Sequence, residues 1–328
     1  MIRRIALIAG FFMLSTTTAT AQKYLGEGTF SFLVENDKFT GTDQHYTNGI
    51  QLTYLSAKDD VPWWLRTPAQ YLPGIQESAA LRAGYVLGHS IFTPSDTLNP
   101  APIPGQRPYA GWLYGGLALV AESEGRLDTW ELDLGIVGPS ARGEQVQNSF
   151  HDLIGVDRAY GWEHELHDEF GYALVYERKW RKLLEHQGTG FGVDFTPYAG
   201  GSLGNVGTYL SLGGTLRIGQ NLPNDFGAPR IRPSLPGTNF FLPRSNFGWY
   251  LFAGAGGRAV AHNIFLDGNS DGDSLGVDRK ILVGDLQAGL VAQIGWARLA
   301  YTYVFRTREF DGQEKPDRFG SIGLSFKF

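Results

Sequence analysis

The sequence predicts a closed antiparallel β-barrel of about twelve strands that spans a membrane. The last residues alternate: Ile322, Leu324, Phe326 and Phe328 are apolar, and the residues between them are small or polar. Residues 1–21 have a basic start, an apolar stretch and an Ala-Thr-Ala cleavage site, as a secretory signal peptide does. No later segment approaches the ~18 consecutive apolar residues of a membrane helix. An exported chain that spans a membrane must therefore close its strands into a barrel, as in the Gram-negative outer membrane.

The composition excludes several other classes of protein. The net charge is −5, which gives no indication of nucleic-acid binding, and the chain has no Cys for disulfides or thiol chemistry. Aromatic residues make up 13% and there are 44 Gly, which suits interfacial girdles and curved sheets. We expect residues 22–328 to form one barrel domain and the protein to be a monomer. A water-soluble β-sandwich is the alternative.

Alternating segments follow one another along the chain. In residues 129–137, bulky apolar side chains alternate with acidic residues, threonine or glycine, which suits a lipid-facing wall and a polar lumen. The twelve predicted strands cover residues 29–36, 49–55, 81–87, 114–121, 129–137, 170–180, 191–203, 208–219, 248–260, 281–294, 297–307 and 319–328.

An even number of strands places both termini in the periplasm, so alternate connections face outward. These outer connections cover residues 38–45, 91–109, 138–168, 204–207, 263–277 and 309–316, of which 138–168 is the longest. The long periplasmic connection 220–246 is unusual. Its prolines Pro223, Pro229 and Pro233 predict an ordered but irregular excursion.

The first polar cluster lies at the predicted outer rim. Glu35-Asn36-Asp37 ends the first strand, and Tyr46-Thr47-Asn48-Gly49 begins the second. A tight hairpin would bring the two groups together. Their carboxylate, amide and hydroxyl oxygens suit a hard cation such as Ca²⁺. A purely structural hairpin with Asn and Asp in turn positions is the alternative.

The second cluster is Arg107-Pro108-Tyr109-Ala110-Gly111-Trp112-Leu113-Tyr114. Its aromatic residues are most simply interpreted as an interfacial belt at the start of a strand. Arg107 can pair with an anionic headgroup at that depth, and we treat Arg107 and Tyr109 as candidate substrate-binding residues.

The third cluster predicts a helix in the longest outer loop. Within residues 143–154, Val146, Phe150 and Ile154 recur at helical spacing, and Gly155 supplies a stop. Gln147 and His151 are four apart and therefore share one face. His is a natural general base near neutral pH, although a histidine in a loop is often simply solvated.

Together the three clusters resemble a known family, the outer-membrane lipid A 3′-O-deacylases. The resemblance rests on the motifs at 35–37 and 46–49, on 107–114, and on Gly-Pro-Ser-Ala-x-Gly-Glu-x-Val-Gln-Asn-x-x-His at 138–151, followed by Gly161-Trp162. It covers most of residues 28–180 and continues weakly to the C-terminus. The last motif is long and specific.

The resemblance implies a Ca²⁺-dependent esterase that removes the 3′-linked acyloxyacyl chain of lipid A, the lipid anchor of lipopolysaccharide. It implies a site between the barrel wall and the helix of the long extracellular loop. Asn36 and Asp37 match the family's Asn-Asp pair, and Thr47 matches its hydroxyl residue, which together would hold the cation. Gln147 and His151 match its helix residues, with His151 as the base that activates water.

The sequence also departs from the family pattern. Characterised members carry a Lys in the second outer loop, whereas residues 91–109 contain none, and Gln106 stands where relatives commonly have Asp. Two rival functions remain open: a narrow passive pore, and an inactive barrel with a structural or adhesive role.

One further motif lies outside the resemblance. Asp267-x-Asn269-x-Asp271-Gly272-Asp273 runs like the first half of a calcium loop, and Asp278 falls where such a loop closes. A second, structural Ca²⁺ is one hypothesis. An acidic hairpin tip is the other.

Overall fold

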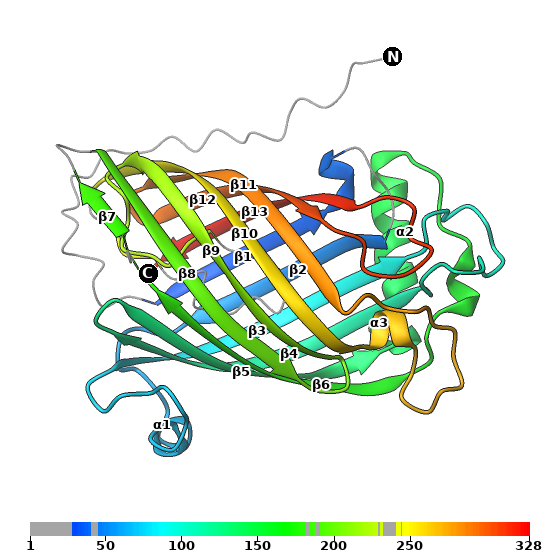
Figure 1. The fold of residues 1–328 in the computed structure, drawn as a ribbon, viewed down its shortest axis with the longest axis horizontal. Coiled ribbons are helices and arrows are strands. Elements are labelled where there is room, and N and C mark those ends of the chain that lie inside the picture. Colours follow the sequence, from blue (N-terminus) through cyan, green and yellow to red (C-terminus); the bar gives the residue numbers. More distant parts are fainter. Residues whose placement is uncertain are drawn as a thin grey trace, which may run out of the picture.

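The computed structural model describes residues 28–40, 45–181, 184–187, 191–228, 230–231, 241–243 and 245–328. The predicted signal peptide at 1–21 therefore lies outside the described residues. Within the described ranges, all strands belong to one antiparallel sheet that curls into a barrel (Figure 1). The strands are β1 (Thr29–Asn36), β2 (His45–Leu55), β3 (Ala80–Thr93), β4 (Ala110–Ser123), β5 (Arg126–Val137), β6 (Glu169–Trp180), β7 (Leu184–Gln187), β8 (Phe191–Leu203), β9 (Gly207–Gln220), β10 (Phe247–Asn263), β11 (Leu282–Ile294), β12 (Ala297–Arg306) and β13 (Asp317–Lys327).

Two pairings close the sheet. β1 pairs with β13, and β6 pairs with the second half of β8. The short β7 pairs with the first half of β8, so β6 and β7 occupy successive parts of one position in the wall. The described strands therefore fill twelve barrel positions, which confirms the predicted closed antiparallel barrel of about twelve strands.

Alternation along the strands separates the lumen from the outer wall. In β5, Glu131 and Asp133 are buried, whereas Leu132 and Leu134 are exposed on the outer wall. This arrangement is the one expected for a polar lumen and a lipid-facing exterior. β3 and β4 extend beyond their predicted ranges because loops cover both faces at their outer ends. Ile91 and Ala110 are buried there, and the alternation disappears.

The β9–β10 connection enters the lumen. Asp225 lies at the centre of a buried group in which it pairs with Arg217 and, at 3.1 Å, with Arg298. Phe226 packs on inward-facing side chains of β2, β4 and β5, namely Leu55, Val120 and Leu127. The described part of this segment therefore runs along the lumen from Phe226, in the periplasmic half, to Ile231, whose backbone N–H donates to Glu35 at the outer end of β1 at 2.7 Å. Pro229 and Pro233 lie outside the described residues.

Short helices lie at both ends of the barrel. These are η2 (Asp37–Thr40), α1 (Trp63–Ala69), η3 (Pro139–Ala141), α2 (Gly143–Ile154), η4 (Gly161–His164) and α3 (Ile264–Asp267). Among the described residues, every helix is too short or too polar to traverse a bilayer. α2 and α3 lie at the end opposite the C-terminus, as predicted for outer loops, and α1 lies near the C-terminal end (Figure 1).

Candidate active site at the outer rim

Helix α2 has the bounds that its apolar spacing predicts. It begins after Arg142, which has a positive φ of 62°, and ends at Gly155, whose φ is 73°. The Gly155 N–H donates to the carbonyl of His151, which satisfies one of the last carbonyls of the helix. A left-handed residue at this position favours glycine, so the stop signal in the sequence acts as expected.

The start of α2 packs directly on the barrel wall. A Cβ atom on Gly143 would lie 2.5 Å from the ring of Trp162, and one on Gly111 in β4 would lie 3.2 Å from the Gly143 nitrogen. A side chain at either position would therefore push the helix away from the strand. This close approach gives the glycines of the second and third motifs a physical role.

Gln147 and His151 both face inward from α2. They are 2% and 1% exposed, so the histidine is not solvated. The indole Nε1 of Trp162 donates to Oε1 of Gln147 at 2.9 Å. The buried Nε2 of Gln147 has no hydrogen-bond partner among the described residues. A buried amide N–H group without a hydrogen-bond partner costs free energy. An oxygen atom of a bound molecule that accepts from it would remove that cost.

One hydrogen bond fixes the tautomer of the His151 ring. Nδ1 lies 2.6 Å from the carbonyl oxygen of Asp157. A carbonyl oxygen can only accept, so Nδ1 carries the proton and Nε2 keeps its lone pair. Arg158 and Asp152 bond at 2.6 Å and 2.9 Å around the turn that presents this carbonyl. The turn therefore holds the His151 ring in one orientation.

The outer end of β1 carries the second half of the site. Asn36 and Asp37 are 2% and 1% exposed. The backbone N–H of Lys38 donates to Oδ1 of Asn36 at 2.8 Å, which is an Asx-type turn at the start of η2. The hairpin tip 41–44 lies outside the described residues.

Thr47 sits in an irregularity of the sheet. The β2–β3 register shifts between Tyr46 and Asn48, which makes Thr47 the extra residue of a bulge. Bulges redirect side chains and are common beside active sites. The Thr47 hydroxyl lies 2.7 Å from that of Thr93, and Thr47 is 3% exposed.

A cleft of about 340 Å³ lies between η2 and the turn that follows α2. Lys38, next to Asp37, lines it on one side, and Asp157, the partner of His151, lines it on the other. The β3–β4 loop supplies the wall between them, with Ser95, Asp96, Thr97 and Leu98. The cleft thus brings together Lys38 and Asp157, which are sequence neighbours of the predicted site; none of the predicted site residues Asn36, Asp37, Thr47, Gln147 and His151 lines it.

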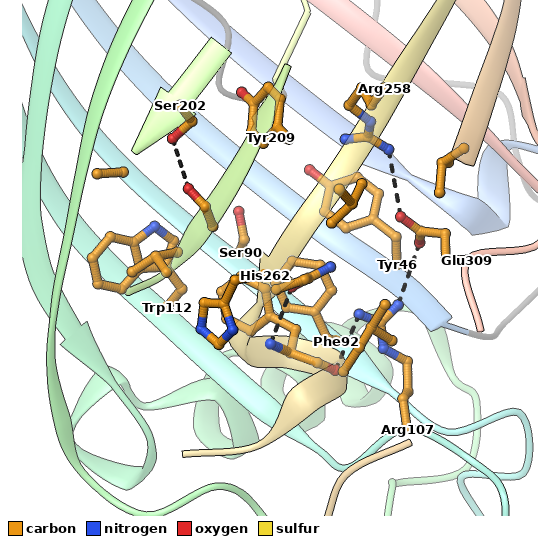
Figure 2. Close-up of a pocket in the computed structure, with 18 of the residues that line it drawn as sticks. Tyr46, Ser90, Phe92, Arg107, Trp112, Ser202, Tyr209, Arg258, His262 and Glu309 are labelled. Carbon is orange, nitrogen blue, oxygen red and sulfur yellow. Dashed lines mark hydrogen bonds and ion pairs between the residues drawn. The ribbon is translucent and has the colours of Figure 1, made fainter. Parts of the chain in front are cut away.

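Arg107 lies elsewhere, in the lumen. It is 1% exposed, its Nη1 is 3.6 Å from Glu309, and it donates to the carbonyl of Phe265 at 3.4 Å (Figure 2). It lines a separate cavity of about 150 Å³ beneath α3. Arg107 does not line the cleft beside α2, so any headgroup contact by Arg107 stays a prediction.

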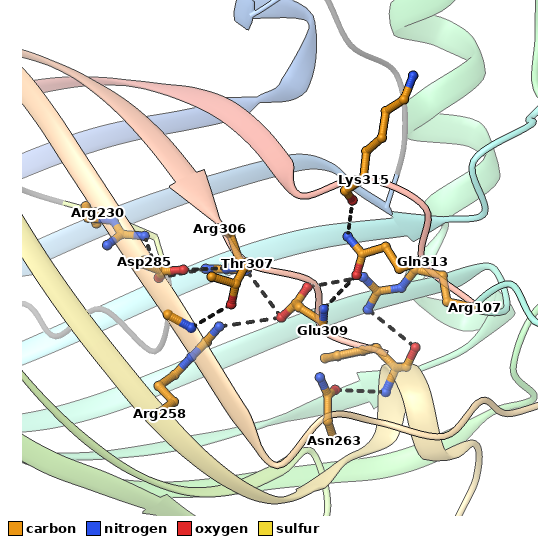
Figure 3. A network of polar contacts seen from close by, with 12 residues as sticks. Arg107, Arg230, Arg258, Asn263, Asp285, Arg306, Thr307, Glu309, Gln313 and Lys315 are labelled. Atoms are coloured by element: carbon orange, nitrogen blue, oxygen red, sulfur yellow. Dashed lines mark hydrogen bonds and ion pairs between the residues drawn. The ribbon is translucent and has the colours of Figure 1, made fainter. Parts of the chain in front are cut away.

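Glu309 belongs to a larger ionic network in the lumen (Figure 3). Arg306 binds Asp285 at 2.8 Å, and both Arg258 and Arg306 approach Glu309. Burial alone would raise the pKa of Glu309, but Arg306, Arg107 and Arg258 together hold it below its usual value. Burial also lowers the pKa of Arg107, against the effect of Glu309. Each charged group in the network has a partner of opposite charge, so we assign the network a structural role in the lumen.

The predicted aromatic belt at residues 109–114 is wrong. Tyr109, Trp112 and Tyr114 are 3%, 6% and 6% exposed, so they do not face lipid. Trp112 and Tyr114 stack inside the barrel with ring centroids 5.2 Å apart. The Tyr109 ring lies 4.9 Å from that of Trp162 and supports the loop of α2, so its substrate-binding role stays a prediction.

The calcium-like loop at 267–278 makes protein contacts. Asp267 accepts from Arg279 at 2.7 Å and lies 2.8 Å from Nδ1 of His262. The Asn269 side chain bonds the backbone of His167 in both directions. Within the part of the chain that the structure describes, no group of three or more His, Cys, Asp or Glu is arranged to hold a metal. These contacts are those of a clamp between two outer loops, and a second Ca²⁺ there stays a hypothesis.

Sequence reasoning missed three contributors to the site. These are the Trp162 indole, the Asp157 carbonyl and Lys38. The Gly161-Trp162 pair was a visible signal for the first. A backbone carbonyl in an irregular turn leaves no residue-type signal at all.

Comparisons with known proteins agree with this architecture. A family model described as "Outer membrane protein LpxR" matches residues 7–328. The chain belongs to the LpxR family. The solved structure of LpxR from Salmonella typhimurium matches with a TM-score of 0.74 at 20% identity, over 92% of this chain and 100% of that one. LpxR-family membership places this barrel in the Gram-negative outer membrane.

Other solved barrels are more distant. The β domain of the Bordetella autotransporter BrkA matches with a TM-score of 0.45 at 11% identity, over 93% of this chain and 99% of that one. The COG4313 outer membrane channel from Pseudomonas putida F1 gives 0.41 at 10% identity, over 93% and 96%. No curated protein sequence matches the chain.

Proposed function

We propose that this LpxR-family barrel is a Ca²⁺-dependent ester hydrolase that removes the 3′-linked acyloxyacyl chain of lipid A at the outer face of the membrane. The observation that supports this most is the buried His151, whose Nδ1 bonds the carbonyl of Asp157, a residue that lines a cleft together with Lys38 of η2. An imidazole held in one tautomer, with Nε2 as its acceptor atom, suits the activation of water.

In the proposed reaction, Nε2 of His151 is the base, because Nδ1 carries the ring proton. Nε2 takes a proton from water while the water oxygen forms a bond to the ester carbonyl carbon. The bond from that carbon to the 3′ oxygen then breaks, and the proton passes from Nε2 to the departing oxygen. The products are a free fatty acid and a 3′-hydroxyl group. The Nε2–H₂ group of Gln147, which has no hydrogen-bond partner among the described residues, would orient the water or the ester oxygen.

The donor atoms fit Ca²⁺ in kind. Asn36, Asp37 and Thr47 offer an amide, a carboxylate and a hydroxyl oxygen, all buried at the outer rim, and hard cations prefer oxygen ligands. A single carboxylate among neutral oxygens predicts weak binding, toward ~10⁻⁴–10⁻³ M. When bound, the cation would polarise the ester carbonyl and stabilise the negative charge that develops on it.

The cleft walls suit a phosphorylated, acylated substrate. Leu98 and Val156 are 52% and 38% exposed and provide apolar contact. Lys38 supplies a cation in the cleft from η2, whereas the β3–β4 loop contains no lysine. We assign this ammonium to headgroup recognition, in place of the second-loop lysine of characterised relatives.

Mass spectrometry of lipid A tests the proposal directly. A Gram-negative host that expresses the chain should yield lipid A lighter by one acyloxyacyl group, and the released mass identifies the chain removed. A folded barrel in the outer membrane with lipid A of unchanged mass, in medium with millimolar Ca²⁺, would favour the rival view of an inactive structural barrel.

A further inference from the structure

Helix α1 presents aromatic side chains to the outside of the molecule. Trp63 and Trp64 in the helix are 78% and 46% exposed, and Tyr71, two residues after its end, is 80% exposed. The helix lies beside the barrel rather than beneath its lumen, at the end that carries the C-terminus (Figure 1). Two-residue turns such as 124–125 and 295–296 mark this as the periplasmic end.

The side chains of α1 sort into three faces. With about 100° per residue, Trp63, Trp64 and Thr67 share one side. Ala69, 1% exposed, lies on the face turned toward the protein. Arg66 lies on a third side, where it donates to the Asp59 carbonyl at 2.5 Å. An aromatic face next to a basic polar one is typical of helices that lie in a membrane interface.

The segment after α1 attaches this helix to the outer surface of the barrel. Trp130 Nε1 donates to the carbonyl of Pro73 at 3.1 Å, and Arg126 donates to that of Gly74 at 3.1 Å. Both donors face outward from β5, since the side chains that alternate with them, such as Thr129, are buried in the lumen. α1 is therefore held against the lipid-facing side of the wall.

The attachment also covers charge. Asp128, fully buried, lies on the same outward face and bonds Arg126 at 2.9 Å, Arg178 at 2.7 Å and the Tyr176 hydroxyl at 2.7 Å. Ionised groups facing lipid are costly, so a loop that covers them fixes the depth of the segment. Gly74 makes the cover possible: its φ is 93°, and a Cβ there would come within 2.6–2.8 Å of these groups.

Outward-facing aromatic residues surround the barrel at this same end. Trp130 and Tyr176 pack at 4.6 Å, and similar pairs lie further around the wall, namely Tyr54–Phe328, Phe191–Trp249 and Trp296–Phe326. Such a girdle marks the membrane–water boundary. The exposed tryptophans of α1 continue the girdle away from the wall.

We propose that α1 is an interfacial anchor whose aromatic face is seated in the phospholipid headgroup–acyl boundary of the periplasmic leaflet. The occupant is lipid because the helix is continuous with the lipid-facing wall and attached at girdle depth. The anchor is independent of the site at the outer rim. It adds contact between the protein and the periplasmic leaflet, whereas the proposed substrate lies in the outer leaflet.

Site-directed spin labelling tests the anchor cleanly, since the chain contains no Cys. Trp63→Cys, Thr67→Cys and, on the third side, Arg66→Cys each carry one nitroxide in vesicles of phosphatidylethanolamine and phosphatidylglycerol. Labels at 63 and 67 should collide several-fold more with O₂, relative to a polar nickel complex, than the label at 66. The position at 67 keeps both tryptophans, so it reports even if Trp63→Cys folds poorly.

A second variant tests the attachment. Gly74→Ala should loosen the cover over Asp128 and increase the mobility of the label at 67, with heat-modifiable gel migration as the check on barrel folding. Equal collision ratios at 63, 66 and 67 would overturn the proposal. So would labels that are wet in vesicles but shielded in whole cells, because a protein partner would then be the occupant.

Discussion

The substitution Trp162→Phe removes one buried hydrogen bond and keeps an aromatic ring. The indole of Trp162 donates to Gln147 at 2.9 Å, and both side chains are almost fully buried. Phe cannot donate, so Oε1 of Gln147 loses its partner, at a cost of about 1–3 kcal/mol. If that cost falls on local opening of the α2 loop, the open fraction rises about 5- to 150-fold.

Hydrogen exchange measures that opening. Amides within α2, such as that of Val146, which bonds the Arg142 carbonyl, should exchange faster by this factor. Amides of the barrel strands should be unchanged. Trp180→Phe is the matched control, because it removes an indole from the wall far from α2 and should leave α2 exchange at the wild-type rate.

A double variant makes the test specific to the bond. Gln147→Leu combined with Trp162→Phe removes both polar partners, so the pair should cost less than the sum of the two single changes. Unchanged exchange of α2 in Trp162→Phe, or strict additivity in the double variant, would refute the view that this hydrogen bond holds the helix.

Three further predictions concern the cation, pH and the lumen. A chelator should abolish hydrolysis by the wild-type enzyme, and added Ca²⁺ should restore it. Asp37→Asn should be inactive with or without added Ca²⁺. Full activity of the chelated wild-type enzyme would contradict this prediction. Burial, with Glu144 and Asp168 nearby, raises the pKa of Glu165 to about 7. The contribution of Glu165 to the stability of the fold is therefore complete below its usual pKa of 4.5 and is lost as pH rises through about 7. In thermal melting, Glu165→Gln should be more stable than wild type at pH 8 but not at pH 4. Asp225→Asn leaves Arg217 and Arg298 with one carboxylate fewer and should lower the free energy of unfolding by about 3–5 kcal/mol. The folded, heat-modifiable gel band should then be lost at a lower temperature. An unchanged transition temperature argues against a supporting role for the β9–β10 connection in the lumen.

Alternation predicted the barrel because the middle of each strand has one face in lipid and the other in a polar lumen. The same logic failed at the outer ends of β3 and β4, where loops bury both faces. It failed again at Tyr109, Trp112 and Tyr114, because interfacial aromatics and buried aromatics use the same residue types. Only tertiary packing distinguishes the two.

The site shows a similar division. Spacing alone placed Gln147 and His151 on one face of a helix, and the structure gives that helix the same bounds. The bulge at Thr47 and the turn carbonyl of Asp157 depend on backbone geometry rather than residue type, so no sequence pattern announces them. Arg107 lies in the lumen because Glu309, two hundred residues later in the chain, lies opposite it.

The rate of lipid A hydrolysis by purified His151→Gln tests the central claim most directly. Gln keeps a side chain of similar length but cannot act as a base, so the rate should fall by ~10²–10⁴ while the barrel stays folded. His164→Gln is the control, since His164 belongs to the same outer loop but is 39% exposed. The account predicts wild-type activity for the control and near-complete loss for His151→Gln. Equal rates for the two variants and the wild type would contradict it.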